Sequence, residues 1–268
     1  MQLSNRTLLA NFTKELAFFQ QMVNGENSAR ILLLEAPPGY GKTKLISKLI
    51  DITKEYNSSK SKVITIDLKT VIDVPYLFND ICEVIGVDFF PNFTTCITNL
   101  LNSQTANISD NKTLGSLNVQ IIQTVLDENK FTQANKLIKL QESFLHDLGN
   151  LNQQLIFFLD TFETVGTDLG TWIDGVFLKA VVHKTNWLVV IAGQKVPSLD
   201  NIIWGNQAEK ICLDLELINC ETEWYKFSQS VGWPFSQDAI KMLIRVLKGK
   251  SPKLIRESLE VLAKDWEK

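Results

Sequence analysis

The chain has 268 residues, of which 45% are apolar and 21% are charged, and its net charge is −3 at pH 7. These values are ordinary for a globular protein, and the slight acidity argues against a chain built mainly to coat nucleic acid. The first residues do not resemble a signal peptide, and no apolar run approaches the ~20 residues of a membrane-spanning helix. We therefore expect a cytoplasmic protein without a membrane partner.

The first elements in chain order are a helix, a strand and a second helix. Apolar residues at helical spacing over 12–23 predict an amphipathic helix, and the apolar run 31–34 predicts a strand that is buried on both faces. Residues from Leu45 to Thr53 again recur at helical spacing, which predicts the second helix. The turn between this strand and this helix is the most informative segment of the chain.

Residues 36–43 read Ala-Pro-Pro-Gly-Tyr-Gly-Lys-Thr, which matches the P-loop pattern Gly-x-x-x-x-Gly-Lys-Ser/Thr with Ala36 in place of the first glycine. Glycines in such a loop let backbone N–H groups surround phosphates, and the dipole of the following helix adds to the attraction. We expect Lys42 to contact the β- and γ-phosphates and Thr43 to ligate Mg²⁺. The residues expected to bind the nucleotide from this loop are Pro38, Gly39, Tyr40, Gly41, Lys42, Thr43 and Lys44.

Strands and helices then alternate before the pattern becomes entirely helical. Strands are expected over 63–67, 155–160, 187–191 and 211–215, and helices over 75–86, 116–128, 131–148 and 169–182. Residues 91–113 are rich in Asn, Thr and Ser, which predicts a long surface loop or a mobile insertion. From about residue 221 only helical spacing remains.

This order of elements predicts an α/β fold in which a parallel sheet is covered by helices on both faces. We expect residues 1–218 to form a nucleotide-binding domain with a polar loop or insertion at about 91–115. Residues 219–268 are expected to form a helical lid. Its last helix has a capping serine at Ser251 and a proline at the first helical position, Pro252.

A second chemical element lies at the end of the strand expected over 155–160. Asp160 ends this strand, where the Walker-B acid of a P-loop ATPase holds Mg²⁺ beside the P-loop threonine. Glu163 follows three residues later and could orient or deprotonate an attacking water, the alternative being a solvated loop carboxylate. Lys42, Asp160 and Glu163 are therefore the candidate catalytic residues, and Thr43 and Asp160 are the candidate metal ligands.

Other polar residues could complete the site. Gln194 or Lys195 could contact the γ-phosphate from the end of the strand 187–191, although an ordinary turn is an equal alternative. Arginine is scarce, so an arginine that stabilises transition-state charge must be one of four residues or come from another chain. The four arginines are Arg6, Arg30, Arg245 and Arg256. Lys253 and Arg256 are the best placed of the basic residues if the lid covers the nucleotide.

The C-terminal segment is the most basic part of the chain. From Lys241 to Lys268 it holds eight basic and four acidic residues. Such a segment can be a nucleic-acid interface or a solvated lid surface, and we favour the second interpretation by about two to one.

With the P-loop, Leu-Asp-Thr-Phe-Glu at 159–163 and Val-Val-Ile-Ala-Gly at 189–193 in this order, the chain resembles STAND-type ATPases. These are signal-transduction nucleotide switches related to AAA+ and origin-recognition ATPases. The resemblance implies a three-layer α/β/α P-loop NTPase fold with a parallel sheet and a C-terminal helical lid. By this likeness Lys42 and Thr43 bind phosphate and Mg²⁺, Asp160 supports the metal, and Glu163 is the hydrolytic acid.

The chain departs from the family pattern at several positions. Gln194 stands where the family often carries Arg, and Lys14 replaces an Arg of the element that borders the adenine. The segment Gly249–Pro252 either has one residue more than the Gly-x-Pro motif of the lid or carries Lys250 in place of its glycine. These departures point to slow hydrolysis.

The main hypothesis is a nucleotide switch that binds ATP/ADP with Mg²⁺ and hydrolyses ATP slowly, and so controls self-assembly or the engagement of a protein partner in signalling or defence. The alternatives are a nucleotide-binding interaction module without hydrolysis and a DNA-associated AAA+ ATPase. A small-molecule kinase is less favoured, because the sequence shows no separate binding site for a molecule that accepts the phosphoryl group.

Overall fold

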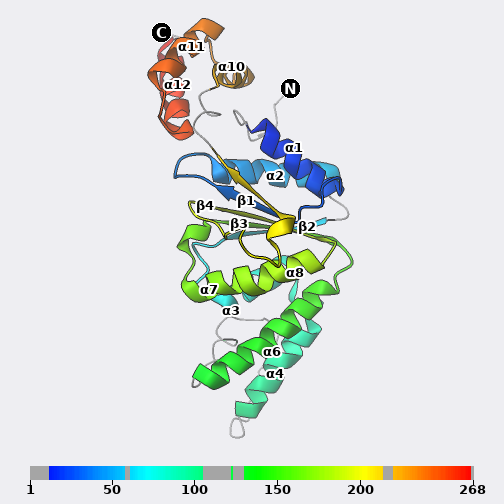
Figure 1. Cartoon of the computed structure of the whole chain (residues 1–268). Helices are drawn as coiled ribbons and strands as arrows, with labels where there is room; N and C mark the ends of the chain where they lie inside the picture. The colour runs from blue at the N-terminus through cyan, green and yellow to red at the C-terminus, as the bar shows by residue number, and fades with distance from the viewer. Residues whose placement is uncertain (1–11, 58–60, 105–121, 123–129, 214–219, 267–268) are drawn as a thin grey trace.

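A parallel sheet lies at the centre of the computed structural model, which describes residues 12–57, 61–104, 122, 130–213 and 220–266 (Figure 1). The strands are β1 (Ile31–Glu35), β2 (Ser61–Asp67), β3 (Gln154–Asp160), β4 (Trp187–Gly193) and β5 (Ala208–Cys212). They are arranged in the order β2-β3-β4-β1-β5, and every neighbouring pair is parallel. Parallel strands end at the same edge of a sheet, so the residues that follow β1, β3 and β4 come together there.

Helices cover both faces of this sheet (Figure 1). One face carries α1 (Thr13–Asn24) and α2 (Lys42–Asn57). The opposite face carries α3 (Val74–Ile85), α7 (Thr167–Trp172), the π-helix Ile173–Phe177 and α8 (Leu178–His183). The predicted α/β/α layers are therefore confirmed.

The core consists of two layers, one on each face of the sheet. In β1, Leu32 and Leu34 pack with α1 and α2, whereas Ile31 and Leu33 belong to the layer on the opposite face. All four side chains are fully buried. A strand that is buried on both faces reads as a continuous apolar run, which is why β1, β3 and β4 were recognisable from the sequence.

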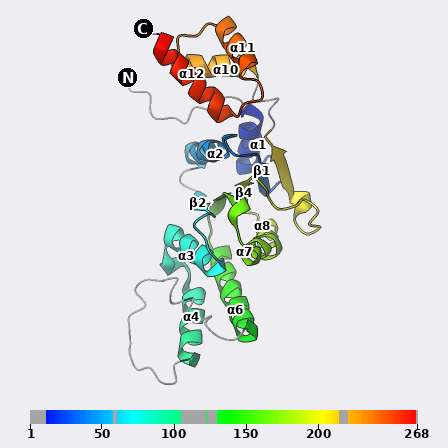
Figure 2. The same cartoon turned by 90° about the vertical axis from the view of Figure 1, so that its left-hand side faces the viewer.

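Two helices extend from the second face, on the side away from α1 and α2 (Figures 1 and 2). They are α4 (Pro91–Gln104), which follows a short 3-10 helix over Val87–Phe89, and α6 (Lys130–Gly149). The prediction of a surface loop is therefore wrong for residues 91–104. Phe93 and Ile97 of α4 are fully buried, and their spacing of four residues is the helical signal that the surrounding Asn and Thr residues obscured.

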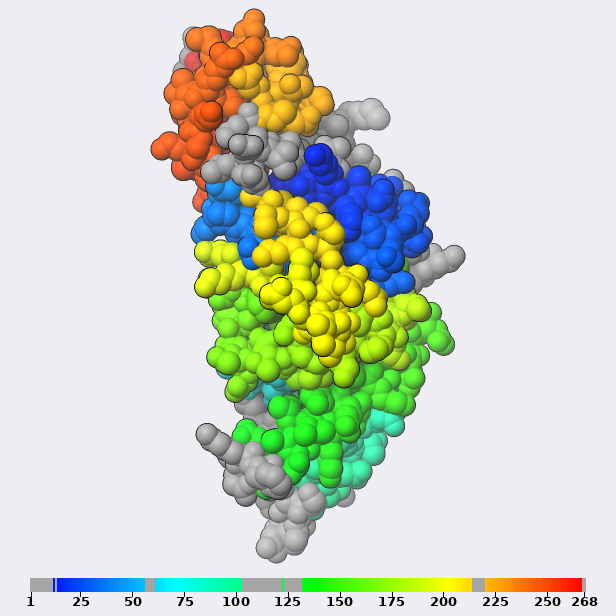
Figure 3. Space-filling model, in the orientation of Figure 1, coloured from blue at the N-terminus to red at the C-terminus, as the bar shows by residue number. Residues whose placement is uncertain are grey.

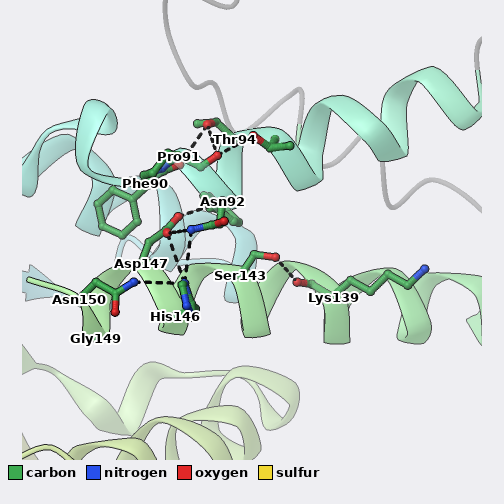
Figure 4. Close-up of polar contacts among 12 residues, drawn as sticks. Phe90, Pro91, Asn92, Thr94, Lys139, Ser143, His146, Asp147, Gly149 and Asn150 are labelled. Carbon is green, nitrogen blue, oxygen red and sulfur yellow. Dashed lines mark hydrogen bonds and ion pairs between the residues drawn. The ribbon is translucent and has the colours of Figure 1, made fainter.

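The start of α4 is held by a carboxylate from α6 (Figure 4). Asp147 accepts hydrogen bonds from the Asn92 side chain at 2.6 Å and from the Phe93 backbone N–H at 2.8 Å. The second of these bonds satisfies an N–H group in the first turn of a helix, which has no partner inside the helix. Because this cap lies 54 residues away in sequence from Phe93, no local pattern could indicate it.

Two other predicted elements differ from the structure or lie outside it. The fifth strand is Ala208–Cys212 instead of residues 211–215. It is an edge strand, and none of its residues is buried. Its sequence therefore lacks the continuous apolar run by which the buried strands were predicted. The helix predicted over 116–128 lies outside the described residues except for Ile122.

Three helices form the C-terminal unit, which is joined to the end of the molecule that carries α1 and α2 (Figures 1 and 3). They are α10 (Glu221–Ser230), α11 (Gln237–Val246) and α12 (Pro252–Trp266), and their buried side chains form a separate apolar cluster. As expected, α12 begins at Pro252, and the Ser251 hydroxyl accepts from the Leu254 N–H at 3.4 Å. The boundary proposed at residue 218 falls within 214–219, outside the described residues.

None of the helices in the described part of the chain has the length and apolar character that a membrane span requires.

Candidate functional site

The P-loop follows β1, a strand that lies between β4 and β5 in the sheet. Gly39 and Gly41 have φ angles of 81° and 87°, which residues with a side chain rarely adopt, so both positions require glycine. Ala36 is buried at the end of the strand, and its backbone N–H donates to the Gly193 carbonyl at 3.1 Å. The residue in place of the first glycine is therefore part of the ordinary strand pairing, and alanine fits there.

Lys42 begins α2, and its side chain folds back over the loop. Its Nζ donates to the carbonyl oxygens of Ala36 and, at 3.1 Å, of Pro37. Burial lowers the pKa of Lys42, and the carboxylates of Glu163 and Asp160 oppose this change. The ammonium group is thus placed beside two acids at the edge of the sheet.

Asp160 ends β3, and its side chain reaches the P-loop helix. Its Oδ2 accepts from the Thr43 hydroxyl at 2.8 Å. The two residues are 117 positions apart in sequence, and the parallel sheet brings them together. A hydroxyl and a carboxylate oxygen are both ligands that Mg²⁺ accepts.

Glu163 lies in the 3-10 helix Phe162–Thr164, and its carboxylate is held by Gln194 at the end of β4. Glu163 Oε2 accepts from the Gln194 backbone N–H at 2.8 Å, and Oε1 accepts from the Gln194 side-chain amide at 3.0 Å. Burial alone raises the pKa of Glu163, but the hydrogen bonds from Gln194 and the charge of Lys42 outweigh it, so the pKa lies below its usual value. Glu163 is therefore ionised at neutral pH.

Gly193 allows this pairing because it has no side chain. A Cβ at this position would lie 2.9 Å from Glu163 Oε2 and in conflict with the Lys195 carbonyl. We expect Gly193→Ala to lower the free energy of unfolding by about 1–3 kcal/mol, because the added methyl group has no room. Urea denaturation measures this loss. Gly175→Ala is the matched control, since a Cβ added there would have no atom within 4 Å, and a Gly193→Ala protein as stable as this control would contradict the expectation.

These residues line one cavity of about 540 Å³ between the sheet edge and the lid. The residues indicated by the sequence that line this cavity are Pro38, Gly39, Tyr40, Gly41, Lys42, Thr43, Lys44, Asp160, Glu163, Gln194, Lys253 and Arg256. Lys195, the alternative to Gln194, is not among the lining residues. The roles assigned to these residues remain predictions.

The lid contributes lining residues that the sequence analysis did not select. Trp224 and Phe227 of α10 lie in the cavity wall together with Phe12, which precedes α1. Trp224 and Phe227 are three residues apart and therefore share one face of their helix, a signal that the sequence did contain. Two acids of α12, Glu257 and Glu260, also line the cavity.

The start of α12 contacts the P-loop directly. The Lys253 backbone N–H donates to the Gly39 carbonyl at 3.2 Å. A Cβ on Gly39 would lie 3.2 Å from the Ser251 hydroxyl oxygen, so lid and loop are closely apposed. On the same helix the Arg256 guanidinium lies 6.0 Å from the centre of the Phe227 ring, within the range of a cation–π contact. The P-loop therefore lies against the first turn of α12.

Comparison with solved structures identifies the fold. The chain is similar to Cdc6p from Pyrobaculum aerophilum, with a TM-score of 0.50 and 13% identity over 91% of this chain and 57% of that one. It is also similar to the Orc1 protein of Aeropyrum pernix, solved in complex with DNA, with a TM-score of 0.52 and 12% identity over 99% of this chain and 63% of that one. The chain has the α/β fold of AAA+ P-loop ATPases.

The chain spans about three fifths of the length of these two proteins. No protein-family model and no curated protein matches its sequence.

Proposed function

We propose that this protein is a nucleotide switch of the STAND type, which binds ATP and ADP with Mg²⁺ and hydrolyses ATP slowly to control self-assembly or the engagement of a protein partner. The observation that carries the proposal is the cavity in which Lys42, Thr43 and Asp160 meet Glu163 below a helical lid. The P-loop sequence, the parallel sheet and the Asp160–Thr43 hydrogen bond all support a triphosphate site with a metal ion.

The residues present fit a nucleotide and Mg²⁺. Gly39 and Gly41 leave the P-loop backbone open to phosphate, and α2 starts at the loop, so its dipole favours an anion there. Thr43 and Asp160 would hold Mg²⁺, which neutralises charge that develops on the phosphates when it is bound. Lys42 would exchange its contacts with the loop carbonyls for phosphate oxygens.

The aromatic part of the cavity suits the base of the nucleotide. Phe12, Trp224 and Phe227 offer apolar surfaces on which a purine ring can stack. Two of these residues belong to the lid, and Lys253 and Arg256 of the lid face the same cavity. A bound nucleotide would therefore contact both the sheet domain and the lid, which is the property that a switch needs.

Slow hydrolysis is supported by the state of Glu163. A general base must be ionised and within hydrogen-bond reach of the water that it activates. Glu163 is ionised, but both of its oxygens accept hydrogen bonds from Gln194. Each carboxylate oxygen can still accept from a water, but the lowered pKa makes Glu163 a weaker base, which supports a low rate.

The basic lid residues bear on the DNA-associated alternative, which rested mainly on the basic C-terminal helix. Lys253 and Arg256 of this helix line the cavity, and Lys253 also lies 3.8 Å from Glu257 in an ion pair. Their side chains remain exposed to solvent. Because both residues face the P-loop cavity, we favour an anionic ligand in that cavity over DNA as the partner of these two charges.

Light scattering of the purified protein with ADP and with ATP plus Mg²⁺, together with measurement of phosphate release, tests the proposal. We expect slow phosphate release and a larger mass with ATP than with ADP, because closure of the lid on a triphosphate changes the exposed surface. A protein that binds neither nucleotide would contradict the proposal. Binding without phosphate release would favour an interaction module.

A further inference from the structure

Thr161 has an unusual backbone conformation immediately after Asp160. Its φ and ψ angles are 63° and 39°, in the left-handed region. Among the residues that the structure describes, it is the only non-glycine residue with a positive φ. This conformation is especially unfavourable for threonine, which is branched at Cβ, so the surroundings must hold it in place.

Each polar group of Thr161 makes a hydrogen bond. The hydroxyl donates to Asp67 Oδ1 at 2.8 Å, and the backbone N–H donates to Asp160 Oδ1 at 2.8 Å. The carbonyl accepts from the Thr164 N–H at 3.1 Å and from the Thr164 hydroxyl at 2.8 Å. The bond to Asp67 is the one that joins this turn to another strand.

Asp67 is well placed to anchor the turn. It ends β2 and is the register neighbour of Asp160 in β3. Its Oδ1 also accepts from the Lys69 N–H at 3.1 Å, and the next residue, Leu68, donates its N–H to the Asp160 carbonyl at 2.9 Å. The carboxylate is therefore fixed to the edge of the sheet, although Asp67 does not line the cavity.

Thr161 lies between the two acids of the candidate site. On one side Asp160 turns toward Thr43, and on the other side the 3-10 helix carries Glu163 toward Gln194. An ordinary helical or extended residue at this position would send the chain elsewhere after Asp160. The left-handed turn thus determines how the two carboxylates are placed relative to each other.

We infer that Thr161 and Asp67 are positioning residues for the proposed ATPase reaction. The Asp67–Thr161 hydrogen bond holds the turn that directs Asp160 to the metal site and Glu163 to the reacting water. This inference rests on the proposed function and adds to it two residues that act through Asp160 and Glu163; of the two, Thr161 lines the cavity and Asp67 does not.

The test compares paired variants in ATP turnover and in Mg²⁺-dependent binding of a non-hydrolysable ATP analogue. Thr161→Val keeps the shape of the side chain but removes its hydroxyl, and Asp67→Ala removes the acceptor. We expect each to lower kcat about tenfold, the effect of one charge-assisted hydrogen bond, with KM changed less than about threefold. Thr161→Ser and Asp67→Asn keep a donor and an acceptor, and should restore most of the rate.

The double variant Thr161→Val/Asp67→Ala distinguishes this role from two separate effects. If both residues act through one bond, the double variant is no slower than the slower single variant. Additive losses would overturn the inference, as would wild-type kcat in either single variant. Asp67 is exposed, so loss of its hydrogen bonds should lower the melting temperature by only about 2–4 °C, and Asp67→Ala keeps the inference testable if Thr161→Val does not fold.

Failure of the proposed function is recognised separately. A wild-type protein that binds the analogue but releases no phosphate from ATP would contradict hydrolysis. The Mg²⁺ dependence of analogue binding would then still test the inference. In that case the measured quantity is the factor by which Mg²⁺ raises the affinity for the analogue. We expect this factor to be about tenfold smaller in Thr161→Val and in Asp67→Ala than in the wild type. A factor equal to that of the wild type would overturn the inference. A wild-type protein that does not bind nucleotide would overturn both proposals.

Discussion

Replacement of Lys42 by alanine is expected to abolish measurable binding of ATP at micromolar protein concentration. The variant removes the ammonium group that the proposed site offers to the β- and γ-phosphates. Loss of one partner of a desolvated charge pair costs about 2–5 kcal/mol of binding free energy, which weakens binding at least about 30-fold. Isothermal titration calorimetry with ATP and Mg²⁺ measures this loss.

The stability of the ligand-free protein provides a check on this result. Burial lowers the pKa of Lys42, so below that pKa the charged lysine lowers the stability of the folded protein. Lys42→Ala removes this penalty together with the bonds to the Ala36 and Pro37 carbonyls, so we expect it to melt close to the wild type. Lys48→Ala, on the same helix but outside the cavity, is the matched control and should bind ATP normally. Unchanged binding by Lys42→Ala would contradict the proposed site.

Replacement of Glu163 by glutamine is expected to lower kcat by about 100-fold or more while ATP binding changes little. Glutamine has nearly the same shape but cannot accept a proton, and general-base catalysis contributes about 10²–10⁴-fold to a rate. Phosphate release and nucleotide titration measure the two effects separately. Asp168→Asn, a neighbouring exposed carboxylate on α7 that does not line the cavity, is the matched control.

The pKa of Glu163 determines the pH dependence that we expect for kcat. The hydrogen bonds from Gln194 hold the pKa of Glu163 below its usual value, so the base stays ionised as the pH falls from about 8 to about 6. We therefore expect no acid loss of kcat that is due to Glu163 in this range. Turnover that survives in Glu163→Gln would show that another group activates the water.

Much of the fold could be predicted because its signals are local. β1, β3 and β4 are continuous apolar runs, and the P-loop between β1 and α2 is a contiguous motif whose two glycines have the expected positive φ angles. The N-terminal cap of α12 at Ser251 was recognisable for the same reason. Each of these features depends on residues within a few positions of one another.

The errors arose where distant residues decide the structure. The polar composition of α4 predicted a loop, but Asp147 of α6 caps this helix, and Phe93 is buried. β5 is an edge strand that is defined by its pairing with β1, so its own side chains carry little information. In both cases the free energy comes from contacts that a single sequence does not reveal.

The sequence by itself determined that this chain carries a P-loop on a parallel α/β sheet, because strand periodicity and glycine conformation are local properties of the backbone. Only the tertiary structure decided how the site is completed. It pairs Glu163 with Gln194, brings Trp224 and Phe227 of the lid to the cavity, and anchors the strained Thr161 to Asp67. These arrangements depend on strands and helices that are far apart in the chain meeting at one edge of the sheet.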